Sequence, residues 1–215
     1  MTRRRVPKEV RERQMLDAAV ATFGRLGYRA ASMDGIAERA GVSKPLLYLY
    51  LNSKEELFTA CIRREAAALA AAVTGAVDAG ESPERQLWGG LLGFFTHTAD
   101  HPDGWAVLYR QARTTGRPFA AEVDVLREGL VEYVAGLFAA AARDAGCDAA
   151  LVGREVTALA HALVGAAESL ADWAGGAPPA SGERPEPKDT AATLMDFAWP
   201  GLEALLARAR TPGTT

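Results

Sequence analysis

The chain has 215 residues, 49% of them hydrophobic and 24% charged, which is enough for a well-buried core in one domain or two small ones. Its two cysteines, Cys61 and Cys147, have neither the spacing of a metal site nor that of a disulfide framework, which fits a reducing cytoplasm. The charged N-terminus lacks the apolar segment of a secretory signal, and no apolar run reaches the ~18 residues of a membrane span. We therefore expect a cytoplasmic protein without a membrane partner.

The net charge of −3 conceals an uneven distribution along the chain. Residues 1–64 contain 13 Lys or Arg and 7 Asp or Glu, whereas residues 65–215 contain 11 and 20. A basic N-terminal head on an acidic body suits a head that meets a polyanion.

The N-terminal segment begins with an arginine arm, Arg3, Arg4 and Arg5. Such an arm is either solvated or lies along phosphates or in a minor groove beside a DNA-binding head, and the sequence leaves both open. A helix is expected from Lys8 to Leu26, with an apolar stripe that includes Phe23 and Leu26, and Gly27 ends it.

The stretch from Ser32 to Lys54 predicts two short helices joined by a tight turn. Ser32 and Ser43 can cap the first free amides of the helices Met33–Ala40 and Lys44–Leu51, and Gly41 can end the first helix in a left-handed conformation. Helix, three-residue turn with glycine, helix is the helix-turn-helix unit, whose second helix can enter a DNA major groove.

The second of these helices is apolar on nearly every side. Leu47 and Leu51 share one face, while Leu46, Tyr48 and Leu49 lie on or near the opposite one. Such a helix is either buried all round or presents its outer face to a partner. Beside a basic arm, the second interpretation predicts a helix that reads a DNA groove.

Residues 11–62 resemble the N-terminal DNA-binding domain of TetR-family bacterial transcriptional regulators. The resemblance rests on motifs in a fixed order and spacing, which are Phe23-Gly24-x-x-Gly27-Tyr28, Ile36-Ala37-x-x-Ala40-Gly41-Val42-Ser43, Leu47-Tyr48-x-Tyr50 and Ser53-Lys54-Glu55-Glu56-Leu57. It implies an all-helical homodimer whose remaining helices bind a small ligand and the partner subunit.

The arm and the resemblance together give a set of expected DNA contacts. The residues are Arg3, Arg4, Arg5, Ser32, Ser43, Lys44, Pro45, Leu46, Tyr48, Leu49, Tyr50 and Lys54. The sequence departs from the common family pattern at Pro45, Leu46 and Leu49, where glycine, a small or polar residue, and histidine are frequent. Recognition is therefore expected to depend on thymine methyl groups and DNA shape more than on bidentate hydrogen bonds.

The rest of the chain also predicts helices, and no stretch alternates as a strand does. Ser53-Lys54-Glu55-Glu56 reads as a capping box. It opens a helix to about Asp78, and further helices are expected at about 83–99, 105–113, 119–143, 148–173 and 189–210. Gly175–Pro187 reads as a linker, and Pro200 should kink or break the last helix. The predicted fold is all-α, with a helix-turn-helix DNA-binding domain over residues 1–54 and a ligand-binding and dimerisation bundle over residues 55–215.

The middle helices carry half of the aromatic side chains, of which the majority should be core and a minority could line an apolar ligand cavity. The candidate pocket residues are Trp88, Phe95, His97, Trp105, Tyr109, Arg110, Tyr133, His161 and Glu168. The histidines lack metal-site spacing, and no catalytic motif is present, so neither a metal, a cofactor nor an enzyme activity is predicted.

The last two helices carry small residues that permit close approach, and the resemblance places the dimer interface there. We expect a ligand-responsive transcriptional regulator, a repressor, that binds a palindromic double-stranded DNA operator as a homodimer and is released by an apolar or aromatic small molecule. The alternative is a small-molecule-binding helical bundle whose head no longer reads DNA.

Overall fold

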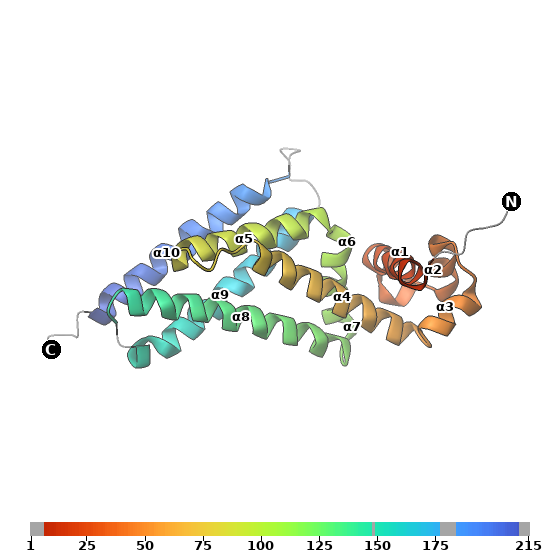
Figure 1. Cartoon of the computed structure of the whole chain (residues 1–215), viewed down its shortest axis with the longest axis horizontal. Helices are drawn as coiled ribbons and strands as arrows, with labels where there is room; N and C mark the ends of the chain where they lie inside the picture. Colours follow the sequence, from red (N-terminus) through yellow and green to blue (C-terminus); the bar gives the residue numbers. More distant parts are fainter. Residues whose placement is uncertain (1–6, 148, 177–183, 211–215) are drawn as a thin grey trace. The chain divides into compact units, whose positions relative to one another are not determined.

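The computed structural model describes residues 7–147, 149–176 and 184–210, and every regular element in this part of the chain is a helix (Figure 1). The all-α fold expected from the sequence is confirmed. The chain forms two compact units, residues 1–67 with 101–124 and residues 68–100 with 125–215.

The first unit begins with the head. Its helices are α1 (Lys8–Ala30), α2 (Met33–Ala40), α3 (Lys44–Tyr50) and the beginning of α4 (Lys54–Gly75). Phe23, Ile36, Leu47 and Phe58, one from each helix, are fully buried and form the centre of its core. The amphipathic spacing of the sequence therefore places these four helices around one another.

Gly27 interrupts α1 with a φ of 82° that favours glycine, but the helix predicted to end there continues to Ala30. Leu26, expected in the core, is instead 61% exposed. The last turn of α1 faces a segment far away in the sequence: a Cβ at Gly24 would lie 2.6 Å from the Asp103 carbonyl oxygen. At this end of α1 the packed face therefore contains the glycines, which let another segment approach closely, and not Leu26 as predicted.

That distant segment also differs from the prediction of a helix at about 105–113. Helix α6 (Pro102–Trp105) already starts at the proline, whose missing N–H does no harm in a first turn. It continues as a π-helix, η1 (Ala106–Ala112), and then α7 (Arg113–Thr115), which stops at Gly116 with a φ of 91°. These elements and the first residues of α8 (Phe119–Asp144) complete the first unit.

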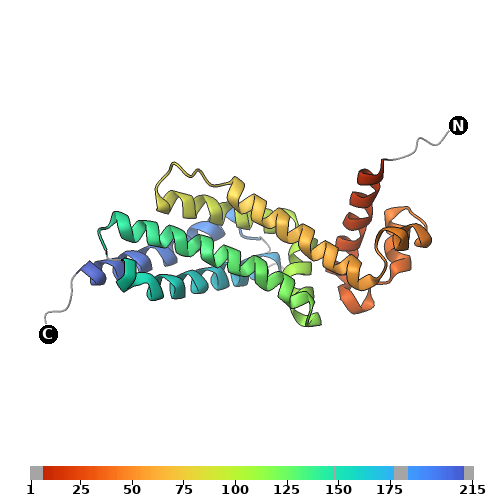
Figure 2. The same ribbon diagram turned by 60° about the horizontal axis from the view of Figure 1, so that its bottom comes forward.

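The second unit is a helical bundle. It contains the end of α4, α5 (Pro83–Asp100), most of α8, α9 (Ala149–Gly175) and α10 (Pro187–Arg210). Helix α10 packs against both α5 and α9, as the two views show (Figures 1 and 2). It runs through Pro200 as one helix, so this proline does not break it. Of the predicted linker, residues 177–183 lie outside the described residues, and Pro187 already belongs to α10.

Glycines set the distance between α4 and α5 in the second unit. A Cβ at Gly89 would lie 2.5 Å from the Ala76 carbonyl oxygen, and one at Gly93 would lie 2.7 Å from the Ala72 carbonyl oxygen. Only glycine at these two positions permits the observed approach of the helices.

The predicted boundary between residues 54 and 55 does not coincide with the division into compact units. Helix α4 continues from one unit into the other, and residues 101–124 return to the first. The boundary at residue 54 separates two functions, DNA binding and ligand binding, and as such it stays a prediction.

Candidate nucleic-acid interface and ligand cavity

Backbone and side-chain caps fix the turn between α2 and α3. The Ser32 hydroxyl accepts a hydrogen bond from the Gly35 amide at 3.1 Å, as predicted. Gly41 adopts the left-handed conformation with a φ of 65°, and the Val42 amide donates to the Ala37 carbonyl at 3.0 Å. This 6→1 bond is the helix-ending pattern that glycine permits. The two short helices therefore leave the turn in a defined orientation.

Ser43 does not cap α3 with its side chain, contrary to expectation, although its carbonyl accepts from the Leu47 amide at 3.1 Å. Its hydroxyl, on an exposed residue, is thus left out of the capping of α3. Pro45 in the first turn has no amide to satisfy, which lessens the need for a side-chain cap.

Helix α3 has one buried side and one uncovered side. Leu47 is completely buried, whereas Leu49 is 78% exposed and Tyr48 is 38% exposed. Lys44 and Pro45 are exposed as well, and Leu46 and Tyr50 are half-buried. An apolar surface on a seven-residue helix, left open to solvent, is the kind of patch that a binding partner covers.

The cations around this surface already have contacts within the head. The Lys44 ammonium lies 2.9 Å from a carboxylate oxygen of Asp34, and this hydrogen-bonded pair raises the pKa of the lysine. The Lys8 ammonium lies 5.7 Å from the centre of the Tyr50 ring. Arg3, Arg4 and Arg5 lie outside the described residues.

Lys54, the predicted phosphate contact at the start of α4, rests on the aromatic core. Its ammonium lies 4.6 Å from the centre of the Tyr28 ring and donates to the Arg29 carbonyl at 3.3 Å. The capping box before it is formed in part: the Ser53 hydroxyl accepts from the Glu56 amide at 3.1 Å. The Glu56 side chain reaches the Asn52 amide, and not that of Ser53 as the motif predicts.

Tyr28 on α1 packs against α4 and the first residue of α8. Its ring lies 4.8 Å from that of Phe58 and 5.3 Å from that of Phe119, between ring centres. Its hydroxyl donates to the Glu55 carboxylate at 2.9 Å. Burial, followed by the hydrogen bond to Glu55, raises the pKa of Tyr28 to about 12. The rings of Phe23, Tyr28, Phe58 and Phe119 thus form a packed aromatic cluster between α1, α4 and the first residue of α8.

The segment after His101 forms a second support for the head, which no sequence motif predicts. Arg25 forms an ion pair of 3.0 Å with Asp103, and the Tyr28 amide donates to the Gln111 side-chain oxygen at 3.3 Å. Gly104 lies directly against the buried Glu65 carboxylate, which pairs with Arg64 at 2.8 Å. Only Gly24 and Gly27, which open space for this segment, could have pointed to it.

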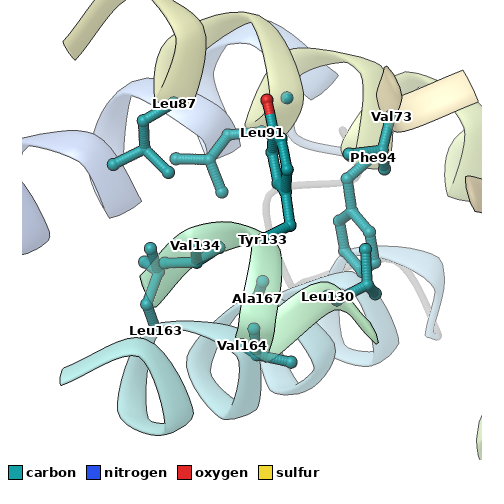
Figure 3. A pocket seen from close by; sticks show the side chains of 11 residues that line it. Val73, Leu87, Leu91, Phe94, Leu130, Tyr133, Val134, Leu163, Val164 and Ala167 are labelled. Carbon is teal, nitrogen blue, oxygen red and sulfur yellow. The ribbon is translucent and has the colours of Figure 1, made fainter. Parts of the chain in front are cut away.

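The second unit contains a small apolar cavity of about 40 Å³ (Figure 3). Its lining is Val73, Leu87, Gly90, Leu91, Phe94, Leu130, Tyr133, Val134, Leu163, Val164 and Ala167. The Tyr133 side chain extends from α8 across the cavity, with Leu87 and Leu91 on one side of its ring and Val73 and Phe94 on the other. Burial raises the pKa of the Tyr133 hydroxyl.

Of the nine predicted pocket residues, only Tyr133 lines this cavity. Trp105, Tyr109 and Arg110 belong to the first unit, where the Trp105 and Tyr109 rings stack at 5.0 Å. Phe95 is buried against Phe94, with ring centres 5.2 Å apart.

The remaining predicted pocket residues are dispersed over the second unit. Trp88 lines an open surface groove with Asp78 and Glu81. His97 is half-buried and His161 is exposed. Glu168 forms an ion pair of 3.3 Å with Arg127 between α9 and α8. Apart from Phe94 and Tyr133, the side chains that line the cavity are aliphatic, and no sequence pattern separates these from ordinary core.

The described residues can also be compared with the requirements of a metal site and of a membrane span. No group of three or more His, Cys, Asp or Glu side chains there could hold a metal ion. Among the helices of the same residues, none combines the length and the hydropathy that crossing a membrane requires.

Comparison with known proteins relates both units to one family. Residues 15–61 match the model of bacterial regulatory proteins of the tetR family, and residues 83–201 match the tetracyclin repressor-like C-terminal domain. The chain is 32% identical over 200 residues to the HTH-type transcriptional activator FasR of Mycolicibacterium smegmatis, covering 92% of this chain and 85% of that protein. The HTH-type transcriptional repressor KstR of the same organism is 36% identical over 77 residues, which are 36% of this chain and 38% of that one.

Solved structures agree. A TetR-like transcriptional regulator from Rhodococcus sp. RHA1 has a TM-score of 0.77 and 40% identity, covering 93% of this chain and 99% of that chain. FadR from Bacillus subtilis, solved in complex with stearoyl-CoA, has a TM-score of 0.66 over 87% of this chain and 97% of its own. At 15% identity, the likeness to FadR is one of fold.

Proposed function

The chain belongs to the TetR family of bacterial transcriptional regulators, and from this premise we propose that it binds a palindromic operator as a homodimer and leaves it when a small molecule enters the cavity of its second unit. The observation that carries the proposal is the outer side of α3, where apolar and tyrosine side chains are uncovered beside Lys44.

The exposed side of α3 has the chemistry of a groove-reading surface. Leu49 and the half-buried Leu46 offer methyl groups to thymine methyls, and the Tyr48 hydroxyl can donate to a phosphate or a base edge. Lys44 stands at the N-terminus of α3, where the free amides also favour an anion. Recognition by these groups depends on apolar contact and DNA shape, with few bidentate hydrogen bonds.

A homodimer would place two such heads on one duplex. Trp173 on α9 is 60% exposed and Phe197 on α10 is 72% exposed, although large apolar side chains favour burial. A two-fold interface over α9 and α10 would bury both in both subunits. Sedimentation velocity tests this: the wild type should run as a dimer and Trp173→Glu as a monomer, and a wild-type monomer at micromolar concentration would overturn it.

The effector should be a largely apolar molecule, because ten of the eleven residues that line the cavity have no polar side-chain atom. The cavity of about 40 Å³ is much smaller than the ~300–1,000 Å³ of usual ligand pockets, so the effector must open it. An effector that binds the opened unit more tightly shifts the dimer away from its DNA-binding state by that difference in affinity alone.

The direction of regulation is a separate part of the proposal. We assign repression, which needs only that the bound dimer exclude the polymerase from the promoter, although the relative FasR is named an activator and KstR a repressor. Transcription in vitro from the promoter upstream of the protein's own gene decides: added protein should reduce the transcript, and an increase would replace repression by activation.

DNA binding is tested by fluorescence anisotropy with that upstream region and with sites selected from random DNA. Leu49→Glu should weaken binding on the order of a hundredfold, because it replaces the apolar contact to thymine methyl groups with a carboxylate in the negative potential of the DNA groove. Val125→Glu is the matched control, since Val125 is 75% exposed but lies in the second unit, and it should bind as the wild type does. Equal affinity of both variants would remove α3 from the interface. A wild type that binds no DNA but does bind small molecules would favour the alternative, a small-molecule-binding helical bundle whose head no longer reads DNA.

A further inference from the structure

Tyr133 brings the one polar side-chain atom into the lining of the apolar cavity. Its hydroxyl oxygen is buried and has no hydrogen-bond partner among the described residues. Native proteins rarely leave a buried polar group unsatisfied, because the group loses its hydrogen bonds to water on burial and forms none within the protein. Such an exception at a cavity wall calls for a partner that is not part of the chain.

Water is a poor partner at this position. A cavity of about 40 Å³ has room for a water molecule, but a buried water needs about two to four polar partners. The side chains around it are Leu, Val, Ala and Phe apart from Tyr133, so a water would make one hydrogen bond to a side chain. A molecule that replaces apolar contacts and brings its own hydrogen-bonding group fits the lining better.

We propose that the effector has an apolar body and one uncharged hydrogen-bonding group, a hydroxyl or carbonyl, which the Tyr133 hydroxyl binds. The inference rests on the proposed function and narrows its effector to a chemical class. Pure hydrocarbons would lose this bond. Doubly polar or charged molecules would bury groups for which the lining offers nothing.

Gly90 on α5 leaves room beside the Tyr133 ring. A Cβ there would lie 3.6 Å from a Val73 methyl, 3.7 Å from a Val77 methyl and 3.9 Å from Cε1 of Tyr133, all ordinary contact distances. Gly90→Ala is therefore compatible with the fold and adds a methyl group next to the ring. In the proposed complex, that methyl group narrows the space for the effector without removing the hydroxyl.

The first experiment measures thermal unfolding of the protein without ligand. Tyr133→Phe should keep the wild-type Tm or raise it, because it removes a polar atom that has no partner. Thr98→Val is the matched control in the same unit. It removes a buried hydroxyl that does donate, to the Phe95 carbonyl at 3.1 Å, and should lower the Tm by roughly 2–4 °C. An equal fall in Tm for Tyr133→Phe would show a satisfied hydroxyl and overturn the proposal.

The second experiment uses two probes of one shape, 1-naphthol and naphthalene, in titration calorimetry. The wild type should bind 1-naphthol more tightly by about threefold to tenfold, the worth of one net hydrogen bond. In Tyr133→Phe the order of the two affinities should reverse, since the naphthol hydroxyl then loses its hydration without gaining a hydrogen-bond partner. Gly90→Ala should weaken both probes. The same order of affinity in the wild type and Tyr133→Phe, or no binding of either probe to the wild type, would overturn the proposal.

DNA binding separates this inference from the function on which it rests. Tyr133→Phe should bind the operator as the wild type does, and 1-naphthol should release the wild type at lower concentration than it releases the variant. Release that is equally sensitive in both proteins overturns the role of Tyr133 and leaves the regulator intact. Preference for 1-naphthol in a protein that binds no DNA would instead contradict the proposed function.

Discussion

In the head, the side chains that we assign to DNA stand on the outside of α3 while the interior beneath them is closely packed. In the second unit, the residues that we assign to the effector are themselves the interior, and they close around about 40 Å³ of free space. Aromatic rings and capped helix ends fix the first interior, whereas aliphatic side chains and one hydroxyl without a partner form the second. A surface that binds a rigid duplex can be preformed, but a small buried cavity has to widen before its ligand fits.

The largest expected effect tests whether the interior of the head is as closely packed as this contrast requires. Phe58 is fully buried, and its ring lies 4.9 Å from both the Phe23 and Phe119 rings. Phe58→Ala should lower the free energy of unfolding by about 3–5 kcal/mol and abolish DNA binding. Hydrogen–deuterium exchange should localise the loss to the first unit, since two compact units need not unfold together.

Leu26→Ala is the control for this substitution. Leu26 is an apolar residue of the same unit but is 61% exposed, so its truncation should change the stability by less than about 0.5 kcal/mol. A small effect of Phe58→Ala would mean that the head can repack, and the contrast with the second unit would fail.

The next effect sharpens the contrast inside the second unit by comparing two glycines of α5. Gly93 faces the α4 backbone, and its Cβ would lie 2.7 Å from the Ala72 carbonyl oxygen, so Gly93→Ala must separate the helices. We expect it to cost about 1–3 kcal/mol, the usual range for overpacking. Gly90→Ala meets only side chains at 3.6 Å or more and should be neutral or stabilising by up to about 1 kcal/mol.

Chemical denaturation of both variants measures the difference. Similar stabilities of the two variants would show that α4 and α5 separate at no greater cost than an added methyl group at the cavity wall. The expected difference between a rigid helix contact and an adaptable cavity wall would then be absent.

A third prediction concerns the stability of the head at alkaline pH. The pKa of Tyr28 is raised from 10.0 to about 12 in the folded protein, so its neutral form stabilises the fold at any pH below 10. This contribution is lost as the pH rises from 10 to 12, because the unfolded chain releases the proton first. Thermal unfolding followed by exchange in the first unit should show a fall in stability over this range. In Tyr28→Phe the part of the fall that belongs to this hydroxyl should be absent, and an identical pH profile would contradict its assignment to Tyr28.

The same contrast explains what the sequence could predict. The helix-turn-helix depends on neighbours in the chain, and the sequence correctly predicts the Ser32 cap and the left-handed Gly41, although the predicted Ser43 side-chain cap is not formed. The cavity depends on which aliphatic residues of four helices happen to leave space, and leucine or valine at a cavity wall is indistinguishable from leucine or valine in a core. Aromatic and polar residues are the ones that a sequence distinguishes from ordinary core, and only Tyr133 of the predicted set lines the cavity.

Long-range support of the head was also out of reach of the sequence. Asp103 and Gln111 are about 80 positions from their partners Arg25 and Tyr28, and neither pair belongs to a periodic pattern. The π-helix that carries Gln111 has no sequence signal of its own either, because its spacing differs from the α-helical period by which helices are recognised.

The smallest expected effect tests whether Lys54 serves the surface or the interior of the head. Its ammonium lies over the Tyr28 ring and donates to the Arg29 carbonyl, so it helps to hold α4 against α1. It also stands at the N-terminus of α4, where the free amides of the first turn favour a phosphate. If it contacts a phosphate, Lys54→Ala should weaken DNA binding about equally for all sequences and reduce the slope of log K against log salt by about one per subunit.

Lys54→Met separates the two roles, because it keeps an unbranched apolar chain against the Tyr28 ring but has no charge to give to a phosphate. Anisotropy titrations at several salt concentrations should give Met and Ala variants the same reduced slope, with the Met variant the more stable. An unchanged slope in both would assign Lys54 to the interior. The DNA surface would then end with α3, and the closely packed part of the head would extend as far as the first turn of α4.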